Sequence, residues 1–145
     1  MATEDNITAV RRFWEGFNTH NLNVWDEVCT ANFMNHDPSL PTPHADLPTI
    51  KQTIGELFFP AFPNLTSSEE DLIATGDRVV IRRTFRGTHT GALMGVAPTG
   101  KAATWTGIFI DRLTGGKIAE QWVVFDALSM LQQIGAVSMP GQGTR

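Results

Sequence analysis

The chain has 145 residues, a net charge of −4, and 41% hydrophobic residues. That length fits one domain, 1–145, with enough apolar residues for a packed core. No cluster of Lys and Arg favours nucleic acid or an anionic membrane as partner. One cysteine, Cys29, excludes an intrachain disulfide and a site with several thiolate ligands. No apolar run approaches the roughly 20 residues of a membrane span, so we expect a soluble, cytoplasmic protein.

The first half of the chain carries helical patterns. Apolar residues recur at spacings of three and four over 7–17, 22–29 and 50–58, which predicts three amphipathic helices, the last stopping before Pro60. Between the second and third helices, a short strand is predicted at 31–37. The segment that follows contains four prolines and predicts a loop over residues 38–48.

The second half of the chain changes to the period of strands. Two hairpins are predicted, each around a turn that contains glycine: 71–75 with 78–87, and 101–112 with 117–125. A last helix over 127–134 is expected to end at Gly135, and 138–145 is expected to be a frayed tail. Helices followed by hairpins predict an α+β domain with its helices on one face of an antiparallel sheet.

Several segments, taken in order, resemble the SnoaL-like polyketide cyclase family, and the resemblance covers roughly residues 5–137. They are Phe13-Trp14-Glu15, Asn35-His36-Asp37-Pro38, the run from Gly87 to Lys101, the run from Gly116 to Trp122, Phe125-Asp126, and the run from Leu131 to Gly135. The resemblance implies the NTF2-like cone, in which a curved antiparallel sheet wraps around N-terminal helices and encloses a deep apolar pocket.

The same resemblance implies a chemistry. Family members of this type carry out cofactor-free intramolecular aldol cyclisation of a polyketide ester, with one aspartate at the end of the last strand as acid and base. The matching residue here is Asp126. The implied ligand is small and hydrophobic, polycyclic compounds included, and no cofactor is implied.

The surroundings of Asp126 in the sequence support that role without the family. It follows an apolar strand and precedes an apolar helix, and a carboxyl group in such a place is desolvated. The alternative is that Asp126 only caps the last helix. Strand alternation places Glu120 and Trp122 on the same face as Asp126, which predicts a pocket wall. Alternatively, Glu120 reaches solvent.

Further candidates come from the histidines and the aromatic residues. His36 is a second catalytic candidate, with a surface histidine as the alternative, and His89 is a binding candidate before a glycine-rich loop. Trp14, Phe17 and Trp105 are expected to line the pocket, although aromatic residues at such spacings are often only core. No histidine pair has the spacing of metal ligands, so we expect no metal.

Three functions remain open at this point. The first is the cyclase-like enzyme, although the cyclases carry a histidine in the strand before the aspartate and here no histidine follows His89. The second is a non-catalytic module that binds a small ligand or forms dimers. The third is a steroid-isomerase-like proton shuttle, for which the tyrosine donor is missing, since the chain has no tyrosine. We also expect a homodimer, because strands 79–85 and 104–110 have more apolar residues than one face can hold.

Overall fold

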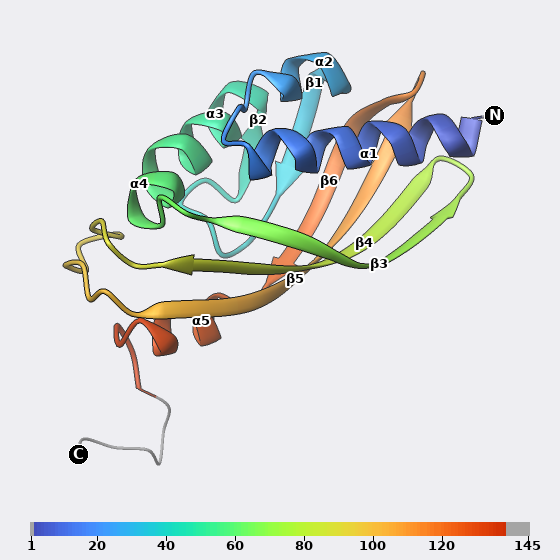
Figure 1. Ribbon diagram of the computed structural model, residues 1–145. Coiled ribbons are helices and arrows are strands. Elements are labelled where there is room, and N and C mark those ends of the chain that lie inside the picture. The colour runs from blue at the N-terminus through green and yellow to red at the C-terminus, as the bar shows by residue number, and fades with distance from the viewer. Residues whose placement is uncertain (1, 139–145) are drawn as a thin grey trace.

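The computed structural model describes residues 2–138 and consists of a curved six-stranded sheet with its N-terminal helices packed on the inner, concave side (Figure 1). The helical segments are α1 (Ala2–Asn18), α2 (Val24–Val28), α3 (Leu47–Thr53), the π-helix η1 (Ile54–Phe58), α4 (Phe59–Ala61) and α5 (Ala127–Gln133). The strands are β1 (Cys29–His36), β2 (His44–Asp46), β3 (Thr66–Thr75), β4 (Arg78–Thr88), β5 (Ala102–Thr114) and β6 (Lys117–Phe125). The predicted α+β architecture, a curved sheet against N-terminal helices, is confirmed.

The strands lie in the order β2-β1-β6-β5-β4-β3. The β3–β4, β4–β5, β5–β6 and β1–β2 pairs are antiparallel, as hairpin connections require. The pair β1–β6 is parallel, with Asn35 opposite Gln121, whereas the sequence predicted an antiparallel sheet throughout. The difference arises because β1 is joined to β6 by most of the chain rather than by a hairpin.

Helix α1 lies across the inner face of the sheet (Figure 1). Its apolar stripe buries Val10, Phe13, Trp14 and Phe17, and Trp25 of α2 stacks on Phe13 with 4.1 Å between ring centroids. Each buried aromatic ring removes a large apolar area from water. This aromatic cluster holds the helix on the sheet and forms one side of the core.

The end of α1 is fixed to β3 by one asparagine side chain. Asn18 Oδ1 accepts from the backbone N–H of Ser67, and Asn18 Nδ2 donates to the Ser67 carbonyl, both at 2.8 Å. The buried guanidinium of Arg83 donates to Ser67 Oγ at 2.9 Å and stacks over the Trp14 ring. Burial lowers the pKa of Arg83 to about 10. These contacts lock the helix to the sheet beside the cavity described below.

Two predictions for the middle of the chain are corrected. The segment 38–48 contains β2 and the start of α3, because Asp46 caps that helix by accepting from Thr49 N–H and Pro48 occupies its first turn, where no donor is needed. The helical path also continues beyond residue 59. Pro60 lies in the first turn of α4, after the π-helix, so its missing N–H breaks no bond.

The predicted hairpin turns and the last helix are confirmed. Gly76, Gly115 and Gly116 adopt the left-handed backbone that the two turns require, and Gly135 does so at the end of α5, with a φ of 84°. Of the tail predicted at 138–145, residues 139–145 lie outside the described residues. Within the described chain, no helix is long and apolar enough to cross a membrane.

Candidate functional site

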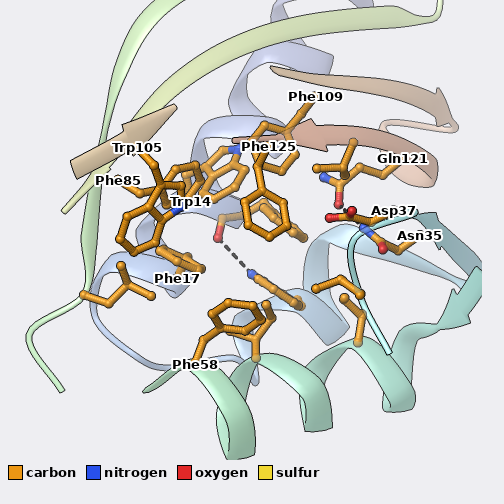
Figure 2. Close-up of a pocket in the computed structure, with 17 residues that line it drawn as sticks. Trp14, Phe17, Asn35, Asp37, Phe58, Phe85, Trp105, Phe109, Gln121 and Phe125 are labelled. Atoms are coloured by element: carbon orange, nitrogen blue, oxygen red, sulfur yellow. Dashed lines mark hydrogen bonds between the residues drawn. The ribbon is translucent and has the colours of Figure 1, made fainter. Parts of the chain in front are cut away.

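A cavity of about 70 Å³ lies between the inner face of the sheet and the helices α1, α3 and η1 (Figure 2). Most of its wall is aromatic or aliphatic. The lining residues are Phe13, Trp14, Phe17, Trp25, Asn35, Asp37, Leu40, Ile50, Ile54, Phe58, Leu65, Phe85, Trp105, Phe109, Gln121, Val123 and Phe125. A pocket with this lining suits a small apolar molecule, and three polar side chains interrupt it.

Those three polar side chains, Asn35, Asp37 and Gln121, lie together at one end of the cavity, away from Trp105 and Phe85 (Figure 2). All three are buried. Asn35 Nδ2 donates to Gln121 Oε1 at 2.9 Å. The cavity is therefore divided into an aromatic part and a polar end, which allows it to orient a ligand.

Asp37 is the carboxyl group at this polar end. It follows β1 directly, and its backbone N–H donates to the Pro43 carbonyl at 2.8 Å, which closes the loop between β1 and β2. Its Oδ1 accepts from the backbone N–H of Ser39 at 2.9 Å. Only 3% of the residue is exposed, and this burial raises the pKa of Asp37, a change that the Ser39 hydrogen bond opposes. Asp37 is thus a better proton acceptor than an aspartate in water.

A second carboxyl group, Asp111 of β5, lies behind the polar end and is fully buried. Its Oδ1 accepts from Gln121 Nε2 at 2.9 Å. Burial raises the pKa of Asp111 to about 7, and the hydrogen bond from Gln121 opposes this rise. Asp111 does not line the cavity, but it contacts a residue that does.

The structure brings Trp14, Phe17 and Trp105 to the cavity wall, where the sequence placed them. It does not place Asp126 there. Asp126 is exposed, and its Oδ1 accepts from the backbone N–H of Ser129 at 3.0 Å as the N-cap of α5. The capping alternative describes its position, because the chain leaves the sheet at Phe125 and the side chain at 126 is free to turn back to the new helix.

The expected pocket face of β6 is also corrected. Glu120 and Trp122 lie on the outer face of the sheet, the face turned away from α1, while Gln121 and Val123 face the cavity. His36 lies on the outer face as well and does not line the cavity. Strand alternation was right that Glu120 and Trp122 share a face, whereas Asp126 lies beyond the strand. It could not say which face is inside, because both faces of β6 carry apolar residues.

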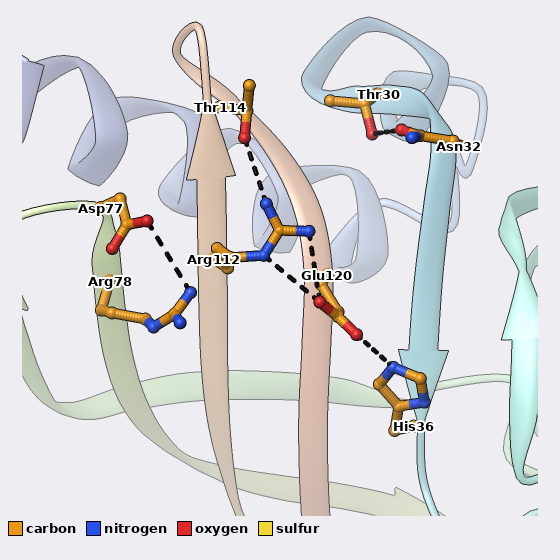
Figure 3. A network of polar contacts seen from close by, with 8 residues as sticks. All are labelled: Thr30, Asn32, His36, Asp77, Arg78, Arg112, Thr114 and Glu120. Carbon is orange, nitrogen blue, oxygen red and sulfur yellow. Dashed lines mark hydrogen bonds and ion pairs between the residues drawn. The ribbon is translucent and has the colours of Figure 1, made fainter.

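The outer-face residues form a polar network of their own (Figure 3). Glu120 accepts from His36 Nε2 at 2.7 Å and from Arg112 at 3.2 Å. His36 Nδ1 is hydrogen-bonded to His44 Nδ1, 2.8 Å away across the β1–β2 pair. Both partners lower the pKa of Glu120, His36 the more strongly. This network supports the strand that leads to Asp37.

His89 is fully buried, but it does not line the cavity. Its Nδ1 accepts from the backbone N–H of Thr99 at 3.2 Å, so the ring proton is on Nε2. The backbone of His89 pairs with Gly100 and Lys101. His89 thus closes the base of the loop over residues 89–101.

The sequence reasoning missed Asn35, Asp37 and Gln121. A signal for the first two was present, because Asn35 and Asp37 alternate with the large apolar Phe33, which predicts one buried face for all three. Gln121 had no such signal. Among residues 2–138, no three His, Cys, Asp or Glu side chains are grouped so that they could hold a metal ion.

The curved sheet, the helices on its inner side and the enclosed apolar cavity together define a small α+β domain of the NTF2-like type, with room for a small molecule. The model of the SnoaL-like polyketide cyclase family matches residues 7–134. The chain belongs to that family.

Solved structures agree with this membership. AclR, a candidate hydroxylase from Streptomyces galilaeus, is 22% identical, with a TM-score of 0.84 over 94% of this chain and 89% of that one. At this identity the likeness shows the fold alone. IdmH, a candidate polyketide cyclase from Streptomyces antibioticus, is 28% identical, with a TM-score of 0.79 over 90% of this chain and 98% of that one. A candidate polyketide cyclase from Bacillus cereus is 27% identical, with a TM-score of 0.77 over 92% and 83%. No curated protein matches the chain.

Proposed function

We propose that the chain is an enzyme that binds a small apolar carbonyl compound in this cavity and catalyses cofactor-free proton transfer, as in an intramolecular aldol cyclisation. The observation that carries the proposal is the buried carboxyl group of Asp37, which lines an otherwise apolar cavity. The proposal places the acid/base role on Asp37 rather than on Asp126, which caps α5 outside the cavity.

The chemistry needs one carboxyl group. Ionised Asp37 removes a proton from a carbon between two carbonyl groups, which leaves a neutral carboxyl and an enolate. The enolate carbon then bonds to a further carbonyl carbon of the same molecule, and the resulting alkoxide takes the proton back from Asp37. Because burial disfavours the ionised form of Asp37, the carboxylate is a stronger base than in water. The reaction consumes no other reagent.

The test uses deuterium exchange at the α-carbon of 1-indanone in D2O, followed by proton NMR and corrected for exchange in buffer alone. We expect the wild-type protein to accelerate exchange and Asp37→Asn to lose about 100-fold or more of that acceleration. Asp126→Asn, which keeps a capping side chain, is the matched control and should retain the rate. If Asp126→Asn loses the rate while Asp37→Asn keeps it, the base is Asp126 and this assignment is wrong.

A specific observation favours a second candidate, a non-catalytic binding module. The cavity volume of about 70 Å³ is below the roughly 300–1,000 Å³ of most ligand sites. A cavity of this size suits a small apolar molecule better than a compound with several carbonyl groups. On this alternative, an apolar probe such as toluene binds in the cavity while the wild-type protein leaves the exchange of 1-indanone at the buffer rate.

The outer face supports a further proposal, that two copies of the chain associate. Ile108 lies opposite Val124, and Ile110 lies opposite Trp122, so four exposed apolar side chains are contiguous on β5 and β6. A patch of this kind is typical of an interface. Sedimentation at micromolar concentration should give the mass of a dimer, and the mass of one chain would contradict the proposal.

A further inference from the structure

A row of three polar side chains crosses the inner face of the sheet. Asn35 of β1 is in register with Gln121 of β6, and Gln121 is in register with Asp111 of β5. All three residues are at least 97% buried. Such a row is costly to bury unless its members are hydrogen-bonded to one another. The two bonds described above connect Asp111 to Gln121 and Gln121 to Asn35, at 2.9 Å each.

The carboxylate at one end gives the row a direction. An ionised carboxylate accepts hydrogen bonds and cannot donate, so Gln121 must turn its NH2 group to Asp111. Its carbonyl oxygen is then turned to Asn35, which must donate through Nδ2. This leaves Asn35 Oδ1 at the other end of the row. Within residues 2–138, no group donates to this oxygen, although it is buried and its residue lines the cavity.

We propose that Asn35 Oδ1 accepts a hydrogen bond from a hydroxyl group of the bound molecule, and that Asp111 is the positioning residue that fixes this acceptor through Gln121. The inference rests on the proposed function in taking the cavity as the binding site. It narrows the ligand to an apolar carbonyl compound with a phenol, enol or alcohol at the end that lies beside Asp37. A molecule with only a carbonyl oxygen makes no hydrogen bond to Asn35 Oδ1, so it binds less tightly than a hydroxyl compound of the same shape.

The first experiment compares two probes of nearly equal shape, phenol and toluene, whose dissociation constants are measured by NMR titration at pH 8. The quantity of interest is the ratio of the two constants, because this ratio removes effects on the cavity as a whole. In Asn35→Leu, the ratio should shift toward toluene by about tenfold or more. Asn32→Leu on the same strand, at an exposed position, should leave the ratio unchanged. An unchanged ratio in Asn35→Leu, or no binding of either probe to the wild-type protein, would overturn the proposal.

A second variant covers the case in which Asn35→Leu does not fold. Asp111→Asn keeps the size of the side chain and touches no ligand, but its amide can either donate to or accept from Gln121. The row then loses its fixed direction, and the preference for phenol should fall about threefold at pH 8. An unchanged preference at pH 8 in a folded Asp111→Asn variant would show that Asp111 does not position the acceptor.

The pH dependence separates positioning from a merely structural role. In the wild-type protein, the preference for phenol should be larger at pH 8 than at pH 5.5, since protonated Asp111 can donate and no longer imposes one direction. The groups that face Asp111 are Gln121 and the buried thiol of Cys29, whose pKa burial raises. Asp37, at the cavity end of the row, also titrates. Asp111→Asn should remove the part of the pH dependence that Asp111 causes, and an identical pH profile in this variant would contradict the inference.

These measurements need no turnover. If the exchange of 1-indanone fails while the probe ratio responds as expected, the proposed function is wrong and the binding inference stands. If exchange depends on Asp37 but the probe ratio does not respond to Asn35→Leu, the proposed function stands and the binding inference is wrong.

Discussion

The two faces of β6 show how differently one strand can be used. On the inner face, Gln121 and Val123 are buried against the cavity, whereas on the outer face Trp122 is partly exposed and 70% of Val124 is exposed. The side chains on the two faces are almost equally apolar. What separates them is α1, whose aromatic stripe covers only the inner face. The position of the site is therefore decided by the helix and not by the strand.

The polar residues on the two faces differ in a second way. The outer Glu120 accepts hydrogen bonds from His36 and Arg112 and has access to water, and these interactions together stabilise its charge. The inner Asp37 and Asp111 have one side-chain hydrogen bond each and are shielded from water. A carboxyl group on the inner face therefore holds its proton more tightly, which suits acid/base chemistry, and one on the outer face stays ionised.

Placing the same charge on each face should have the largest effect on stability. Val123→Asp puts a carboxylate into the cavity without a partner and should lower the free energy of unfolding by about 3–5 kcal/mol or prevent folding. Val124→Asp should leave the fold intact by far-UV circular dichroism and, if two copies associate through this face, convert the dimer to single chains in sedimentation. Equal loss of structure in both variants would mean that the two faces are not distinct.

The buried Asp111 should make stability depend on pH. Its pKa in the folded protein, about 7, is above its unfolded value of 3.8, so the folded state binds more protons and stability falls as the pH rises from about 4 to about 7. Asp111→Asn removes the charge that causes this loss of stability, but it also leaves part of the new amide without a partner. The net effect should be a rise in the free energy of unfolding at pH 8 of roughly 1–3 kcal/mol. Urea unfolding at pH 5 should show a much smaller gain. An equal gain in stability at pH 5 and at pH 8 would show that Asp111 is not the group whose titration changes the stability.

The cap of α5 should have a smaller effect. Asp126→Ala removes the acceptor for the Ser129 N–H and should cost about 1 kcal/mol, while Asp126→Asn should be nearly silent. Thermal unfolding of the two variants measures the difference. A large loss of stability in Asp126→Asn would show that the charge of Asp126 does more than cap the helix.

The smallest effect is expected on the outer face. Glu120→Gln weakens the contacts with His36 and Arg112, which are partly exposed, so the change in the free energy of unfolding should stay within about 1 kcal/mol. Because the pKa of Glu120 is lowered in the folded state, its contribution is present at neutral pH and is lost as the pH falls through that lowered pKa. The exchange rate of 1-indanone should not change. A clear loss of rate would show that the outer network contributes to catalysis.

Much of the fold could be predicted, because the periods of helix and strand and the turn glycines are local signals. The family resemblance added the curvature of the sheet. The candidate site could be predicted at its aromatic residues, at Trp14 and Phe17 on a helix with one apolar stripe and at Trp105 on β5. It could not be predicted on β6, where both faces are apolar, or at Asp126, where a strand end fits a pocket and a helix cap equally well. Which carboxyl group is shielded from water depends on contacts between segments far apart in the sequence, such as β1 and β6.

The most direct test of the central claim compares two titrations of Asp37. Carboxyl-carbon NMR gives the midpoint at which Asp37 loses its proton, and the pH dependence of 1-indanone exchange gives the midpoint at which the catalyst becomes active. We expect one shared midpoint above the ordinary value of 3.8, present in Asp126→Asn and absent from the rate profile of Asp37→Asn. A midpoint for Asp37 at or below 3.8, or a rate profile that does not follow its titration, would contradict the claim that Asp37 is the acid and base of this site.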